Sequence, residues 1–112
     1  MTASYFVFYR GQQSDLKSFV NRYKREHVSL LREFPGIKRI RIHTPLDWHD
    51  PCQTTSGEFA LIAEMEFESL HALESALQSE ARVRARADIQ ATPPPTSTTI
   101  WHQAMHTDTP LL

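Results

Sequence analysis

A histidine lies on the apolar side of the longest amphipathic segment in the sequence. Apolar residues occupy positions 16, 19, 20, 23, 30, 31 and 34, which is the i, i+3, i+4, i+7 spacing of one helix face. His27 is four residues after Tyr23 and four before Leu31, so we expect its imidazole to point toward the same core. A titratable group in that place is either a hydrogen-bonded structural histidine or the working group of a pocket.

The chemistry open to His27 is proton transfer. Histidine titrates near neutral pH, and a positioned acid or base accelerates a reaction by roughly a hundredfold to ten-thousandfold. Burial lowers the pKa of an imidazole and favours its neutral form, which can act as a base. We therefore predict that His27 is a general acid or base in a largely apolar pocket. The alternative is an inward imidazole that is bonded to a backbone carbonyl or to a tyrosine.

Two tyrosines and two tryptophans are candidates for contact with a substrate. Tyr23 lies one turn before His27 and could orient it or donate to a substrate oxygen, and Tyr9 ends an aromatic segment in a similar way. Trp48 and Trp101 could form the walls around an aromatic ligand. The alternative for each tyrosine is a core side chain with its hydroxyl near the surface. The alternative for each tryptophan is a core side chain without a role in ligand binding.

Two arginines form a further candidate. Arg39 and Arg41 alternate with apolar residues, which places both on one face of a strand. They could bind a carboxylate or an enolate oxygen. The alternative is an ion pair with Glu64 or Glu66 on a neighbouring strand.

The sequence carries no motif for a metal or a cofactor. It has six histidines but neither a Cys-x-x-Cys nor a His-Glu-x-x-His pattern. Its three glycines are too dispersed for a phosphate-binding loop. We therefore predict an activity that needs no metal and no cofactor.

Composition narrows the class of protein. A net charge of −1 indicates no nucleic-acid partner, and no apolar run approaches the length of a membrane helix. Cys52 is the single cysteine, which excludes a disulfide within the chain and favours a reducing, cytoplasmic location. A length of 112 residues fits one domain, which we place at 1–112.

Hydrophobic periodicity and turn residues predict the order β-α-β-β-α-β. The expected elements are a strand buried on both faces at 5–9, a helix at 16–34, a strand at 37–43, a loop at 44–57, a strand at 58–67, a helix from 70 that Ser79 and Glu80 interrupt before 89, and a strand at 97–106. This order is the ferredoxin-like α+β plan, with one antiparallel sheet and both helices on one face. The other face is too apolar to stay bare, so we predict a homodimer through the open sheet face.

The residues also resemble a known family, the EthD-like branch of the dimeric α+β barrel superfamily. The block Tyr23…His27-Val28-Ser29-Leu30…Pro35-Gly36 carries the resemblance, together with the aromatic strand that ends in Tyr9-Arg10 and the stretch Glu64 to Leu73. It covers about residues 4 to 106. The resemblance implies a dimeric barrel with a pocket in each subunit between sheet and helices, and a family histidine at His27. Such proteins are linked to the degradation of small organic compounds and to aromatic or polyketide ring chemistry, and the superfamily includes cofactor-free monooxygenases.

Three functions stay open at this point. The first is a small cofactor-independent enzyme, an oxidoreductase or a lyase or isomerase, that acts on a hydrophobic oxygen-bearing metabolite in a catabolic pathway with His27 as acid or base. The second is a ligand-binding or accessory dimer that uses the same pocket without catalysis. The third is a dimer with a closed pocket and a scaffold role.

Overall fold

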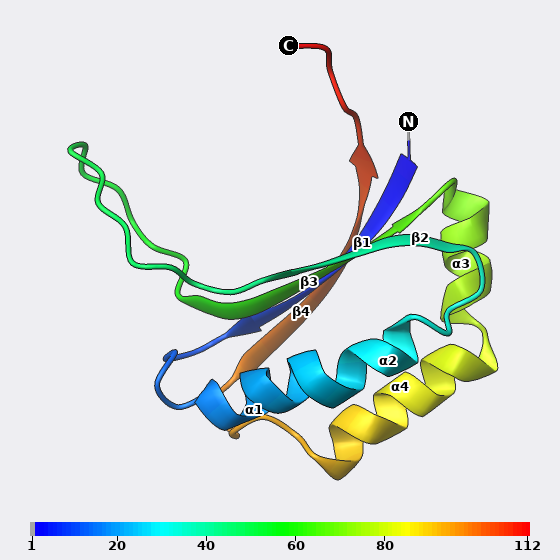
Figure 1. Cartoon of the computed structure of the whole chain (residues 1–112), viewed down its shortest axis with the longest axis horizontal. Coiled ribbons are helices and arrows are strands. Elements are labelled where there is room, and N and C mark those ends of the chain that lie inside the picture. The colour runs from blue at the N-terminus through cyan, green and yellow to red at the C-terminus, as the bar shows by residue number, and fades with distance from the viewer. Residues whose placement is uncertain (1) are drawn as a thin grey trace.

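The elements follow the predicted order along the chain. The structure is a computed structural model that describes residues 2–112. Its elements are β1 (Thr2–Arg10), α1 (Lys17–Arg22), η1 (Tyr23–His27), α2 (Val28–Leu31), β2 (Ile37–His43), β3 (Phe59–Phe67), α3 (Leu70–Leu77), α4 (Glu80–Ala91) and β4 (Thr99–Thr107). Figure 1 shows α1, α2 and α4 below the sheet, α3 at its right-hand end, and nothing packed on its upper face.

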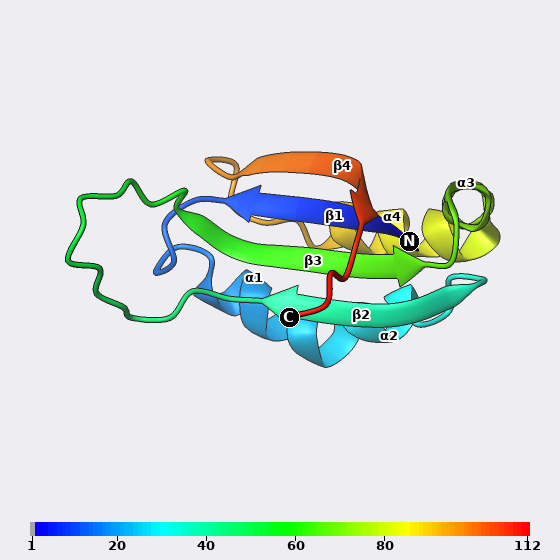
Figure 2. The ribbon, with the colours of Figure 1, turned by 90° about the horizontal axis from the view of Figure 1, so that it is seen from above.

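The four strands form one antiparallel sheet in the order β2-β3-β1-β4. β3 and β1 are therefore central and β2 and β4 are the edges, as seen from above in Figure 2. All helices cover the same face. This arrangement confirms the predicted ferredoxin-like α+β fold.

The two faces of β1 differ, which corrects the expectation that this strand is buried on both. Tyr5, Val7 and Tyr9 are buried beneath the helices. Phe6 and Phe8 point to the other face and are only half-buried. Both faces of the strand thus carry apolar side chains. The second face belongs to the open side of the sheet, over which no other segment of residues 2–112 packs.

The first helical segment is not the continuous helix expected for 16–34. α1 runs into the π-helical turn η1, which is followed by the short helix α2. A π turn makes i→i+5 hydrogen bonds, and such turns are frequent at functional sites. η1 begins at Tyr23 and ends at His27, and both side chains are buried. The regular helix ends at Leu31, before the turn that contains Pro35 and Gly36.

The second helical segment breaks where the sequence predicted. The hydroxyl of Ser69 accepts a hydrogen bond from the backbone N–H of Ala72 at the start of α3, and Ser79 does the same for Arg82 at the start of α4. Such caps satisfy otherwise unpaired N–H groups of the first turn. α4 then packs beside α2 and η1 and runs antiparallel to them (Figure 1). None of the helices in residues 2–112 is long and apolar enough to cross a membrane.

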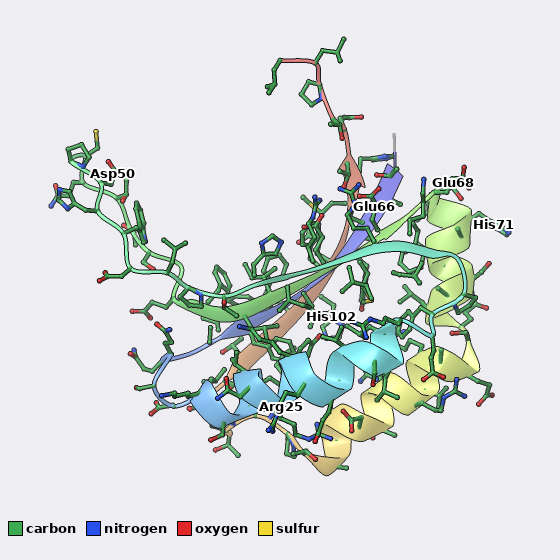
Figure 3. All side chains as sticks on the ribbon, viewed as in Figure 1. Arg25, Asp50, Glu66, Glu68, His71 and His102 are labelled. Atoms are coloured by element: carbon green, nitrogen blue, oxygen red, sulfur yellow. The ribbon has the colours of Figure 1, made fainter. Side chains whose placement is uncertain are left out.

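The segment between β2 and β3 projects from the sheet as an extended arm (Figures 1 and 2). Asp50 lies near its tip in Figure 3. Trp48 lies on this arm and is 60% exposed. The arm is thus separate from the core that the helices and the sheet enclose.

Candidate functional site

A cavity of about 130 Å³ lies between the sheet and the helices. Its walls come from β1, β3, β4, η1, α2 and α4, and most of them are apolar. An engineered apolar cavity of about 150 Å³ holds one benzene molecule, so this space suits a single ring or a short acyl chain. The space beside His27 is therefore open rather than filled by the core.

His27 stands in the wall of this cavity and is only 3% exposed. Its Nδ1 lies 2.8 Å from Oδ2 of Asp88, which comes from α4. A carboxylate in that position accepts the Nδ1–H and fixes the imidazole in one tautomer. Nε2 then carries the lone pair, and it has no hydrogen-bond partner within residues 2–112. One ring nitrogen of this cavity-lining imidazole is thus fixed by Asp88, and the other is left without a protein partner among the described residues.

Asp88 is itself held by a second cation. Nη1 and Nη2 of the Arg22 guanidinium both donate to its carboxylate, at 3.1 and 2.7 Å. Arg22 also pairs with Glu26, one turn later on the same helical segment, at 2.9 Å. The hydrogen bonds from Arg22, supported by His27, lower the pKa of Asp88 to about 2, although partial burial opposes this. Asp88 is therefore ionised at neutral pH.

The protonation state of His27 follows from its surroundings. Burial lowers its pKa below the ordinary value, while Asp88 opposes the shift and Arg22 adds to it. The net direction is downward, so the imidazole is neutral near pH 7. This is the direction expected from the sequence, and a neutral imidazole can accept a proton.

Tyr9 and Tyr23 also line the cavity. The ring of Tyr23 lies 4.5 Å from that of His27, and the ring of Tyr9 lies 5.6 Å from that of Tyr23. Burial raises the pKa of Tyr9 to about 12 and that of Tyr23 well above its usual value. Both hydroxyls therefore stay protonated at neutral pH.

A second polar group reaches the same cavity from the sheet. The hydroxyl oxygen of Tyr5 on β1 lies 2.6 Å from Nδ1 of His102 on β4. A guanidinium nitrogen of Arg82 on α4 donates to that hydroxyl at 3.3 Å. Figure 3 shows His102 in the layer between the sheet and the helices. Arg86, one turn after Arg82, lines the cavity as well.

Three of the predicted substrate-binding residues lie outside this cavity. Arg39 is exposed on β2, opposite Glu66 of β3. Trp48 is on the projecting arm. Trp101 precedes His102, so strand alternation turns it to the open face, where it faces Phe59 at a ring distance of 6.1 Å. Their contact with a substrate stays a prediction.

Arg41 forms the ion pair that was the alternative to a substrate-binding role. Its guanidinium donates twice to the carboxylate of Glu64 on the open face of the sheet. His43 also lies against Glu64, with its Nε2 at 3.0 Å from the carboxylate. These groups belong to the open face and not to the cavity.

Sequence reasoning missed Asp88, Tyr5, Arg82, Arg86 and His102. Asp88 carried one signal, because it is the single acidic residue between 81 and 89, in a stretch otherwise rich in arginine. No local pattern pairs Tyr5 with His102, which are 97 residues apart. Within residues 2–112, no three His, Cys, Asp or Glu side chains gather closely enough to hold a metal ion.

Solved structures with the same architecture identify the fold. An EthD family protein from Bacillus halodurans matches with a TM-score of 0.69 and 18% identity, over 92% of this chain and 97% of that one. The chain has the fold of this EthD family protein. This likeness confirms, for the fold, the resemblance seen in the sequence.

Two oxygenases share the EthD-like fold. SnoaB, a cofactor-independent oxygenase from Streptomyces nogalater, matches with a TM-score of 0.59 and 12% identity, over 98% of this chain and 96% of that one. A monooxygenase from Streptomyces coelicolor, in complex with nanaomycin D, matches with a TM-score of 0.63 and 14% identity, over 99% and 90%. Neither a family model nor a curated protein matches the sequence.

Proposed function

We propose that this chain is a small enzyme that moves a proton on a hydrophobic, oxygen-bearing metabolite bound in the cavity, with His27 as the acid or base. One observation carries the proposal. His27 is held by Asp88 through Nδ1, and its other nitrogen is left without a protein partner in the wall of an open cavity. A structural histidine buried in a packed core would have no such space beside it.

The step is a simple proton transfer. Nε2 of neutral His27 takes a proton from a carbon next to a carbonyl, or from a phenolic O–H, and the electron pair moves to the ligand oxygen. The imidazolium that forms is stabilised by the ionised Asp88. Return of the proton to another atom gives isomerisation, and the same anion could begin a lyase or an oxygenase reaction.

The similar structures support an enzyme without a cofactor. Two of them are oxygenases, and one of these is described as cofactor-independent. We therefore propose that the protein needs no cofactor and acts on an aromatic or polyketide-like compound. A catabolic role in the cytoplasm fits the EthD resemblance and the single free cysteine, Cys52.

The proposed test uses pentane-2,4-dione, whose central C–H protons are acidic and whose size suits the cavity. Wild-type protein in deuterated water is expected to accelerate the exchange of these protons, as followed by NMR. His27→Gln should lose the acceleration, because an amide cannot accept the proton, while His71→Gln on the exposed side of α3 should keep it. Equal exchange by the wild type and His27→Gln, or no acceleration by the wild type, would refute the proposal.

We further propose that the protein is a homodimer through the open face of the sheet. Phe8 is half-buried there, and Trp101, its neighbour on β4, is 44% exposed. Met105 lies further along the same face of β4, opposite Ser4, and is 47% exposed. A surface that brings together several large apolar side chains is typical of a protein interface. Two-fold packing of two such faces would cover them.

Light scattering tests this assembly. The wild type is expected to run at twice the chain mass at micromolar concentration. Trp101→Glu places a charge in the proposed interface and should give a monomer. Val83→Glu places the same charge on the exposed side of α4 and should leave the dimer intact. A monomeric wild type would exclude the proposed dimer, as would an unchanged mass for Trp101→Glu.

A further inference from the structure

We infer that Tyr5, His102 and Arg82 form an oxyanion-binding group in the cavity, and that the ligand is a single-ring phenol or a similarly small enol. The inference deepens the proposed function, on which it rests, because both concern the same cavity. His27 would take the proton, and this second group would hold the oxygen on which the negative charge develops. The assignment follows from geometry, charge and size.

The geometry gives Tyr5 two close partners. The Tyr5 oxygen accepts a hydrogen bond from Arg82 at 3.3 Å and lies 2.6 Å from Nδ1 of His102. We assign His102 the Nδ1–H tautomer, in which this nitrogen is a second donor to the Tyr5 oxygen. The hydroxyl hydrogen is then free to point to a ligand. All three side chains line the cavity. A donor whose oxygen is already held by two N–H groups is preorganised for an anionic acceptor.

The charge of the cavity also favours an anion. Arg82 and Arg86 line it, whereas no acidic side chain among residues 2–112 does. Asp88 lies behind His27 and is already engaged by Arg22. Arg86 forms no ion pair with a carboxylate in the described chain. The cavity therefore carries positive charge that a ligand oxyanion would balance.

The protonation states are consistent with this role. Burial raises the pKa of Tyr5, against the opposing effect of Arg82 and Arg86, so its hydroxyl remains a donor at neutral pH. Burial lowers the pKa of His102, and the positive charges of the same two arginines lower it further. The dyad is thus neutral, and the fixed positive charge comes from the arginines.

The size of the cavity limits the ligand. A space of about 130 Å³ holds one ring but not a fused polycyclic system. Arg86, Gln90, Ile100 and His102 are its exposed lining residues, so the cavity opens between α4 and β4. Larger substituents of a ligand would have to leave through this side.

The test uses 4-nitrophenol, which titrates near neutral pH and changes colour on ionisation. The wild type is expected to bind the phenolate in preference to the phenol and to lower the pKa of the bound probe. Arg82→Gln and Tyr5→Phe should each weaken phenolate binding by about tenfold, which is the size of a lost hydrogen bond to a charged group. Arg84→Gln is the matched control, because Arg84 is exposed on α4 and pairs with Glu33. Its binding should equal that of the wild type.

The outcomes separate this inference from the proposed function. His27→Gln should still bind the phenolate, since it removes the base and not the oxyanion group. Loss of proton exchange with phenolate binding retained in that variant supports both. A probe that binds as the neutral phenol, or Arg82→Gln and Tyr5→Phe variants that both fold by circular dichroism and bind like the wild type, would overturn the inference. Proton exchange by His27 could survive that result.

Discussion

Replacing Asp88 with asparagine would remove the charge that holds both Arg22 and His27 while keeping the size of the side chain. Asp88 accepts two hydrogen bonds from Arg22 and one from His27. Asparagine can keep part of this geometry but none of the charge. Arg22 would retain Glu26 as its partner. The variant therefore isolates the electrostatic part of the interaction.

The magnitude follows from the pKa of Asp88. A fall from 3.8 to about 2 corresponds to roughly 2.5 kcal/mol of native-state stabilisation. The side chain is 19% exposed, and solvent screening reduces this to about 1–2 kcal/mol. Because the pKa of the folded state lies below that of the unfolded state, the stabilisation is complete above about pH 4. It is lost as the pH falls through 4 towards 2.

Urea unfolding between pH 7 and pH 3 measures this effect. Asp88→Asn should unfold with about 1–2 kcal/mol less free energy than the wild type at pH 7, and the difference should shrink as the pH falls below 4. Asp47→Asn, on the exposed arm, is the control and should match the wild type. NMR titration should also show a lower pKa for His27 in Asp88→Asn, because Asp88 normally raises it. A difference in unfolding free energy that does not change with pH would refute the reasoning.

Three further predictions concern the frame around the cavity. Leu61→Ala should lower the free energy of unfolding by about 2–5 kcal/mol, because Leu61 is fully buried. Leu70→Ala, at an exposed site, should lower it far less, and urea unfolding compares the two variants. Ser69→Ala removes the hydroxyl that caps α3 at the N–H of Ala72 and should cost about 1 kcal/mol by the same method, and a neutral effect would argue against the cap. Gly36→Ala should lower the melting temperature, because Gly36 has a φ of +75° that alanine tolerates poorly. The added methyl group meets no clash, so an unchanged melting temperature would count against backbone strain at this position.

Local sequence patterns were sufficient to predict the order of the helices and strands and the inward orientation of His27. The spacing of apolar residues marked the buried side of the first helical segment, and Ser79 and Glu80 marked the break between α3 and α4. The direction of the pKa shift of His27 followed from burial alone. Neither Tyr23 nor His27 carried a signal for the π-helical turn η1, which replaces regular helix there. Its position depends on how the segment packs on the sheet and on α4.

The partners of the site depended on contacts that no local pattern shows. Asp88 reaches His27 across 61 positions, and α4 has almost no apolar periodicity that would fix which of its sides faces inward. His102 and Trp101 are adjacent but lie on opposite faces of β4. Their assignment requires the register between β1 and β4, because a shift of one residue exchanges the two faces. The tryptophan was therefore expected at the site where the structure has the histidine.

The dependence of proton exchange on pH is the most direct test of His27 as the base. Wild-type protein with pentane-2,4-dione is expected to exchange faster as the pH rises through the pKa of His27, with a midpoint below the ordinary imidazole value of 6.5. His27→Gln should show no such step. A step of the same size and midpoint in the His27→Gln variant would contradict the account, as would a wild-type rate without any step.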